Sequence, residues 1–189
     1  MAISAEYPQF PRIDVEDYLT LDTTSQTAKY EYLEGEVSML AGGSNNHALI
    51  AANMIMLLGN VLKKSPCCVY SSDVRVKLAE NTYVHPDVTV ACDERDSEKT
   101  DNIEYPRILV EVLSPSTEYV DRGKKLLYYR ACSTVQEYIL IDSRTKFVEV
   151  HSRKGKGWMS LTYGSEGVVE IASLNLTLSL EDIYEKTRL

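Results

Sequence analysis

Cysteine-based sites and phosphate-binding loops are missing from this sequence. The four cysteines form no C-x-x-C pair and no Cys/His array, so we expect no structural zinc site. Neither G-x-x-x-x-G-K-S/T nor G-x-G-x-x-G occurs, which excludes the two common glycine-rich loops that cradle phosphates. The chain also has no internal repeat and no low-complexity segment.

Long hydrophobic runs are missing as well. The longest apolar stretch, Ala48 to Leu62, is interrupted by Asn53, Gly59 and Asn60, and it is shorter than the ~20 residues that a membrane span needs. The first residues carry acidic side chains and no apolar core, unlike a signal peptide. We therefore expect a cytoplasmic protein without a membrane segment, in which the four cysteines are reduced thiols.

Positive charge is scarce: 20 Lys and Arg residues face 28 Asp and Glu residues, for a net charge of −8. This balance argues mildly against broad, non-specific binding of nucleic acid, although a local basic groove remains compatible with it. The chain has 189 residues, of which 44% are hydrophobic and 25% charged, as in ordinary globular domains. We expect one domain over 1–189, with a loose N-terminal tail at 1–11 and a C-terminal strand extension at 155–189.

Hydrophobic periodicity predicts helices and strands in one mixed order. Expected helices cover 15–21, 46–63 and a segment from a cap at Ser116 or Thr117 to about Ala131. A hairpin is expected around Glu34-Gly35, and 93–102 is expected to be a mobile loop. Further strands are expected at 68–78, 87–93, 107–114, 137–142, 146–153, 157–164, 167–173 and 176–180. The fold class is therefore α/β or α+β, with a mixed central sheet flanked by helices.

Glu111 is the most informative single residue. It lies inside the apolar run Ile108 to Leu113, where an ionised carboxylate is costly unless it is paired or bound to a metal. Strand alternation places Glu111 on the same face as Leu109 and Leu113. A purely structural alternative is a carboxylate at the strand end that is partly exposed or paired with an arginine, but we favour a functional role.

Asp87 is a stronger candidate for a functional residue when it is considered together with Glu111. Alone, an Asp after a proline is more often turn chemistry. Two carboxylates at the ends of neighbouring strands, however, can share one hard cation, and Mg²⁺ takes one or two carboxylates while keeping several waters. Such an ion polarises a phosphoryl oxygen and lowers the pKa of a bound water.

Lys124 and Lys125 lie in the expected helix that follows Glu111. Both could be solvated surface lysines, and only one of them can point back to the strand. Lys125 shares a helix face with Asp121 and with Tyr129, each four residues away. A lysine that reaches the strand end would orient an attacking water or stabilise developing negative charge.

Several other polar residues remain ambiguous. His47, early in the second expected helix, is more often a packed or surface residue than a ligand. Asp73 is either a third acid near the metal or a turn cap, and we favour the cap slightly. Glu31 and Glu36 lie in the expected hairpin, where they could line a groove or be solvated.

Three segments resemble a known family: HPDVTVACDE, RILVEVLSPSTEYVDRGKKLLYYR and VQEYILID. Together they look like the Uma-type putative restriction endonuclease family, which belongs to the PD-(D/E)xK nuclease superfamily. The resemblance covers about 30–151, and KYEYLEGEV, NNHALIAANM and YSSDVRV fit the usual order of the family. It implies a restriction-endonuclease-like fold.

The resemblance also implies a site. It assigns Asp87 and Glu111 as acids that bind Mg²⁺ or Mn²⁺, with the backbone carbonyl of Val112 completing the set. The usual lysine of the superfamily lies two residues after the Glu, where this sequence has Leu113. The resemblance implies a migrated lysine that matches Lys125, with Lys124 pointing elsewhere.

Three functions follow as hypotheses. The first is a metal-dependent endonuclease that hydrolyses phosphodiester bonds in DNA, with Asp87, Glu111 and Lys125 as its catalytic residues. The second is a catalytically degenerate nuclease fold that binds nucleic acid or protein. The third is a dimerisation module, because the strands from 157 onward add a sheet edge that could pair with a second copy. A homodimer is compatible with all three.

Overall fold

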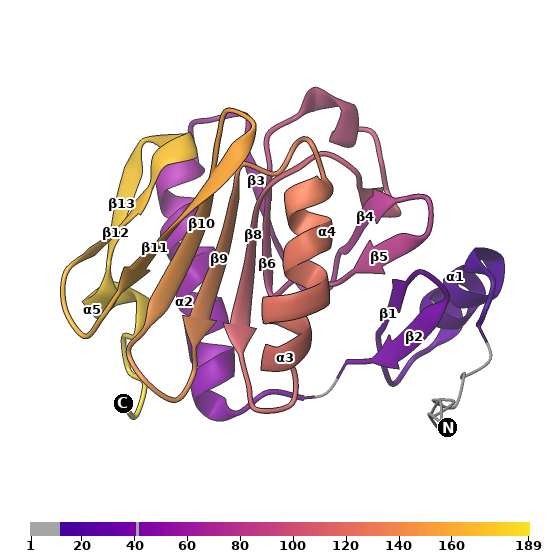
Figure 1. Ribbon diagram of the computed structural model, residues 1–189, viewed down its shortest axis with the longest axis horizontal. Coiled ribbons are helices and arrows are strands. Elements are labelled where there is room, and N and C mark those ends of the chain that lie inside the picture. Colours follow the sequence, from indigo (N-terminus) through magenta and orange to yellow (C-terminus); the bar gives the residue numbers. More distant parts are fainter. Residues whose placement is uncertain (1–11, 41) are drawn as a thin grey trace, which may run out of the picture.

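Two β-sheets and one β-hairpin form the β-structure of the described residues (Figure 1). The computed structural model describes residues 12–40 and 42–189, so the tail predicted at 1–11 lies outside the described residues. Within the described ranges no helix combines the length and the apolar composition needed to cross a bilayer.

The larger sheet is mixed, as the sequence predicts. Strands β8 and β9 run parallel, and every other neighbouring pair is antiparallel. The six strands follow this order across the sheet: β11 (Gly157–Tyr163), β10 (Val148–Lys154), β9 (Glu137–Asp142), β8 (Pro106–Leu113), β6 (Val88–Ala91) and β3 (Cys68–Ser71). Strand β11 is therefore one edge of the sheet.

The smaller sheet carries the predicted N-terminal hairpin. Its turn is Glu34-Gly35, and both residues have positive φ, 53° and 95°. This is the backbone that a tight two-residue hairpin turn requires. The five strands follow this order: β2 (Glu36–Met39), β1 (Tyr30–Leu33), β5 (Thr82–Val84), β4 (Arg75–Ala79) and β7 (Asn102–Ile103). Helix α1 (Val15–Thr24) packs on it through Tyr18, whose ring stacks on Tyr32 at 5.0 Å.

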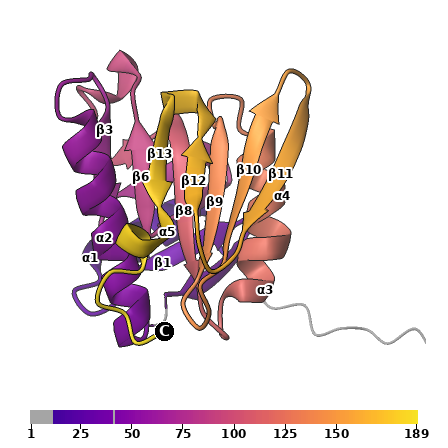
Figure 2. The same ribbon diagram turned by 90° about the vertical axis from the view of Figure 1, so that its left-hand side faces the viewer.

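Helices cover both faces of the larger sheet. Helix α2 (Asn45–Leu62) packs one face with Ile50, Met54 and Leu58, against the valines that alternate along β6 and β8. The hairpin of β12 (Val168–Ile171) and β13 (Leu176–Ser179), with η3 (Ala172–Leu174) between its strands, packs on that same face, as does α5 (Leu180–Ile183) (Figure 2). On the opposite face, α4 (Leu126–Ala131) packs Tyr129 against Leu109 and Leu113. The face alternation predicted for β8 is therefore confirmed.

The expected helix after β8 is present but interrupted. It comprises α3 (Glu118–Val120), a π-helical turn η2 (Asp121–Lys125) and then α4. A π-helical turn inserts a residue into the α-helical repeat and often marks a functional position. Here the turn contains both Asp121 and Lys125, which are buried.

The single strand predicted over 68–78 is wrong. The chain forms β3 in the larger sheet, turns at Ser72-Asp73 and then forms β4 in the smaller sheet. Ser71 Oγ donates to Asp73 Oδ2 at 2.9 Å, so the polar residues close a local turn that alternation alone hides. The strand expected at 87–93 is present as β6, which begins at Val88, and the preceding β5 ends at Val84, before Pro86.

Two further expectations need correction. Cys67 and Cys92 form a disulfide. They continue the antiparallel register of β3 and β6, in which Cys68 pairs with Ala91, so the chain brings them face to face. Cys68 and Cys132 are free. The segment 93–102, expected to be a mobile loop, contains η1 (Glu94–Asp96) and reaches into β7.

Candidate active site

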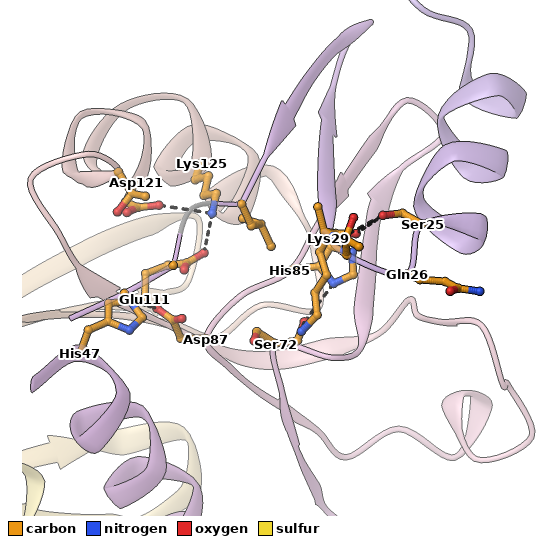
Figure 3. Close-up of a pocket in the computed structure, with 16 residues that line it drawn as sticks. Ser25, Gln26, Lys29, His47, Ser72, His85, Asp87, Glu111, Asp121 and Lys125 are labelled. Atoms are coloured by element: carbon orange, nitrogen blue, oxygen red, sulfur yellow. Dashed lines mark hydrogen bonds and ion pairs between the residues drawn. The ribbon is translucent and has the colours of Figure 1, made fainter. Parts of the chain in front are cut away.

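The three residues that the sequence singled out line one pocket of about 610 Å³. We call the part of the pocket lined by Asp87, Glu111 and Asp121 its acidic end. This end lies where β8 ends and β6 begins (Figure 3). Val88 pairs with Val110, so the next step of this antiparallel register places Asp87 opposite Glu111 on the same face of the sheet. Lys125 reaches the same point from the π-helical turn. The other wall of the pocket comes from 25–29, between α1 and β1.

Glu111 is held by two donors on the helical segment. Lys125 Nζ lies 3.0 Å from Glu111 Oε1, and the Tyr129 hydroxyl donates to the same oxygen at 2.6 Å. Glu111 itself is only 4% exposed. The predicted approach of Lys125 to the end of the strand is therefore present, and the shared helix face brings Tyr129 with it.

Lys125 is surrounded by carboxylates. Its Nζ also lies 2.9 Å from Glu31 Oε1 and 3.3 Å from Asp121 Oδ1. Burial acts to lower the pKa of Lys125, but the carboxylates of Glu111, Glu31 and Asp121 outweigh it and raise the pKa well above its ordinary value. The ammonium is therefore charged at neutral pH.

Acidic side chains cluster around Lys125 at this end of the pocket. Burial raises the pKa of Glu111 well above its usual range, and repulsion from Asp121, Asp87 and Glu31 adds to this effect while Lys125 opposes it. Burial likewise raises the pKa of Asp121. A raised pKa favours the protonated, neutral form, so burial and the neighbouring acids together oppose ionisation of these two groups.

Asp87 is fixed by β8 and faces α2. The Val112 amide donates to Asp87 Oδ2 at 2.7 Å, and His47 Nε2 lies 3.3 Å from the same oxygen. Burial acts to lower the pKa of His47, but the Asp87 carboxylate and the Val112 backbone raise it overall. His47 therefore belongs to this site.

The start of α2 positions His47. Ser44 caps the helix, and its Oγ accepts a hydrogen bond from the His47 amide at 3.2 Å. A Cβ at Gly43 would lie only 2.6 Å from His47 Nδ1, so the imidazole occupies the space that a side chain would need. Glycine at 43 thus allows the ring to lie over the backbone beside Asp87.

The structure places the remaining candidate residues in different environments. Glu31 is a buried partner of Lys125. Glu36 instead pairs with Lys124 at the surface, so the prediction that Lys124 points elsewhere is confirmed. Asp73 pairs with Lys29 and accepts from Ser71, which fits the turn role and not a metal ligand.

The chemistry of the donor set fits a hard cation. Asp87 and Glu111 supply carboxylate oxygens next to the Val112 backbone, and oxygen ligands are those that Mg²⁺ and Mn²⁺ prefer. Across 12–40 and 42–189, no group of three or more His, Cys, Asp and Glu side chains is arranged to hold one ion. An ion here would rely on two carboxylates, a backbone oxygen and water, a coordination that Mg²⁺ accepts.

Comparisons with known proteins agree with this fold. The chain is similar to two uncharacterized proteins of Synechocystis, at 35% identity over 93% of this chain and 93% of the relative, and at 32% over 79% and 88%. The fold is similar to that of the crystal structure of a "putative nuclease belonging to DUF820" from Anabaena variabilis. The TM-score is 0.75 at 20% identity, over 91% of this chain and 97% of the other.

A family profile covers nearly the whole described fold. The family described as "Putative restriction endonuclease", Uma2, matches residues 15–182, from α1 to α5. This range contains both sheets and every residue of the acidic end of the pocket. The chain therefore belongs to the Uma2 family of restriction endonuclease-like proteins.

Proposed function

We propose that this protein is a metal-dependent endonuclease that hydrolyses phosphodiester bonds in DNA. The observation that carries the proposal is the meeting of Asp87, Glu111 and Lys125 at one pocket, with Lys125 Nζ 3.0 Å from Glu111 Oε1. Family membership supports a nuclease-like activity. The requirement for a metal ion and the preference for DNA are the parts that we propose.

Asp87, Glu111 and the Val112 carbonyl would hold Mg²⁺ or Mn²⁺. When bound, such an ion polarises a phosphoryl oxygen and lowers the pKa of a bound water. The protein keeps Asp87 in place through the Val112 amide and Glu111 in place through Tyr129. Both carboxylates are therefore oriented before a substrate arrives, which reduces the reorganisation needed in the reaction.

Lys125 would perform the role of the lysine that the superfamily carries on the strand. Leu113 occupies that strand position and packs in the core beside Tyr129. The π-helical turn instead delivers the Lys125 ammonium to Glu111. A fixed positive charge here would orient the attacking water or stabilise charge developing on the phosphate.

A cleavage assay tests the proposal. We expect cleavage of double-stranded and single-stranded DNA substrates by the wild-type protein in Mg²⁺, lost on addition of a chelator. Glu111→Ala should reduce the rate by at least ~100-fold, since it removes a preorganised charged group. Lys124→Ala is the matched control, because Lys124 pairs with Glu36 outside this cluster. Equal rates for wild type and Glu111→Ala would remove Glu111 from the mechanism.

A nuclease fold that binds without cleaving is the second candidate. The burial of Lys125 favours it, because this residue is only 4% exposed and is already engaged by Glu31, Glu111 and Asp121. A lysine so enclosed has little freedom to meet a substrate. The same assay separates the two candidates, since DNA that is retained but never cut in Mg²⁺ or Mn²⁺ favours the binding protein.

A further inference from the structure

A group of basic residues lies at the end of the larger sheet opposite the acidic pocket. Strands β8 and β9 begin at this end, and the turn between β10 and β11 projects from it, while the arrowheads of β8 and β9 point to the other end (Figure 1). We call this group the basic end. Its members are Arg107, Arg130, Arg153, Lys154 and Lys156.

The charges of the basic end are not neutralised. Ten Lys and Arg residues elsewhere form ion pairs, whereas none of these five lies within 4.0 Å of a carboxylate of the described chain. Lys154 and Lys156 are exposed in the turn. Five unpaired cations in a chain of net charge −8 are a strong local departure from its average.

Neutral acceptors hold the guanidinium groups in place. Arg153 donates to the Val135 carbonyl at 2.8 Å and to the Cys132 carbonyl at 2.7 Å. Arg107 donates to the Ser173 carbonyl at 2.7 Å. A guanidinium anchored on carbonyl groups keeps its full charge and loses little freedom on binding an anion.

Trp158 lies among these cations. It faces Arg153 across β10 and β11, and the Arg153 guanidinium carbon lies 4.5 Å from the centre of its ring, with that of Arg130 at 5.8 Å. Aromatic rings next to guanidinium groups are the combination on which nucleic-acid bases stack beside their phosphates. Trp158 is also the only tryptophan of the chain, so its fluorescence reports on this surface alone.

Neighbouring titratable groups agree with a positive surface. His151 lies beside Arg130, which donates to its Nδ1 at 2.9 Å. Burial lowers the pKa of His151, and Arg130 and Arg122 lower it further, against the opposing effect of Glu149. The nearest carboxylate in the hollow below the turn, Glu137, is fully buried and accepts hydrogen bonds from Ser152 and Ser173.

We propose that the basic end binds the phosphate backbone of nucleic acid, as an anchoring surface separate from the acidic pocket. The choice of nucleic acid over other polyanions rests on the proposed function. Arg107 and Glu111 are four residues apart on β8, or ~13 Å at the usual strand rise. This separation, along a strand that helices cover on both faces, keeps the two places distinct.

Fluorescence of Trp158 tests the proposal without any cleavage. The experiment titrates Glu111→Gln protein in a chelator with single-stranded and duplex oligonucleotides, and it follows both tryptophan emission and oligonucleotide anisotropy. We expect the emission change to track binding, with affinity that falls steeply with salt. Binding that leaves the emission unchanged would overturn the proposal, as would no binding at low salt.

Charge reversal locates the effect. Lys154→Glu/Lys156→Glu should weaken binding at least tenfold and lower the salt slope by about 2, since each phosphate contact contributes about one unit. Lys63→Glu/Lys64→Glu is the control, because these exposed lysines follow α2, away from the β10–β11 turn, and carry the same charge. Equal weakening by both pairs would show a general charge effect and overturn the proposal.

Two additional measurements keep the outcomes distinct. Lys154→Ala/Lys156→Ala removes charge from an exposed turn without reversing it, and it should weaken binding by less than the Glu pair in the same direction. Heparin serves as a polyanion without bases. Heparin binding with no oligonucleotide binding would contradict nucleic acid as the partner. Because no cleavage is measured, failure of the nuclease proposal would leave these results unchanged.

Discussion

At the residue scale, the buried lysine is the centre of the site. Lys125 lies within 3.3 Å of three carboxylates from β1, β8 and the π-helical turn. A charge removed from water is tolerated only when its partners are well placed, and it becomes costly when one partner is lost. The stability of the site and its chemistry therefore depend on the same side chains.

Replacing Lys125 should destabilise the fold. Lys125→Met keeps the length of the side chain but leaves Glu31, Glu111 and Asp121 without their shared cation. We expect a loss of ~3–5 kcal/mol in the free energy of unfolding at neutral pH, measured by urea denaturation. Lys124→Met is the control and should change it by less than ~0.5 kcal/mol, because Lys124 is exposed. A neutral Lys125→Met would show that the carboxylates do not need the lysine.

Glu111 should make stability depend on pH. Burial, with repulsion from Asp121 and Asp87, raises its folded-state pKa well above 4.5. The folded protein therefore binds this proton more tightly than the unfolded chain, so the contribution of Glu111 to stability is fully present below the unfolded pKa and is lost as pH rises through the folded pKa. Gln cannot ionise and avoids this loss.

The predicted result is a stability difference that grows with pH. Relative to wild type, Glu111→Gln should gain free energy of unfolding between about pH 4 and pH 8, in urea titrations with a chelator. A difference that is constant across this range would mean that the folded-state pKa of Glu111 is not raised.

Some residues of the candidate site could be predicted from the sequence because they are related by local strand and helix geometry. Strand alternation and the helical spacing of four bring Glu111, Lys125 and Tyr129 together through local geometry that a sequence displays. Glu31 and His47 come from β1 and α2, whose approach to β8 depends on how the two sheets pack. The pairing of Asp87 with Glu111 followed from the expectation that their strands are neighbours, and the register of β6 and β8 places the two residues opposite each other.

At the element scale, the start of α2 and the π-helical turn set the geometry of the pocket. Leu113 occupies the strand position where the resemblance expects a lysine, and in our proposal the π-helical turn supplies Lys125 instead. Local patterns predicted a continuous helix there, because the π-helical turn depends on the buried contacts of Asp121 and Lys125. Similarly, the apolar pattern over 68–78 could not show that its two halves join different sheets.

Gly43 offers a test of how α2 positions His47. In Gly43→Ala the new Cβ would meet the imidazole at 2.6 Å, so the ring must move away from Asp87. We expect a loss of ~1 kcal/mol or more in unfolding free energy, and a change in the His47 ring signals by NMR. Gly42→Ala has no atom within 4 Å of its new Cβ, so it should be close to neutral. Equal effects of both variants would refute the steric role.

At the whole-molecule scale, the pocket lies between the two sheets, and one edge of the larger sheet is open. Lys125 joins Glu31 of the smaller sheet to Glu111 of the larger sheet, so the site couples both parts. Strand β11 pairs only with β10 among the described strands. Open edges of this kind invite pairing with another chain.

A homodimer through β11 remains our prediction. Met159 and Leu161 lie two residues apart on β11 and are 41% and 42% exposed, so they share one face of this edge strand. We expect light scattering to show a dimer that Met159→Lys/Leu161→Lys converts to a monomer. Leu127→Lys, at an exposed position on α4, should remain dimeric. If light scattering shows a wild-type monomer at every concentration, the prediction is wrong.

The central claim is that Asp87 and Glu111 together hold one divalent ion beside Lys125. Calorimetric titration of Mn²⁺ into the wild-type protein and into Asp87→Asn tests it most directly. The account predicts one Mn²⁺ bound per wild-type chain and none bound by Asp87→Asn, with both proteins folded. A wild-type protein that binds no Mn²⁺, or an Asp87→Asn variant that binds it equally well, would contradict the account.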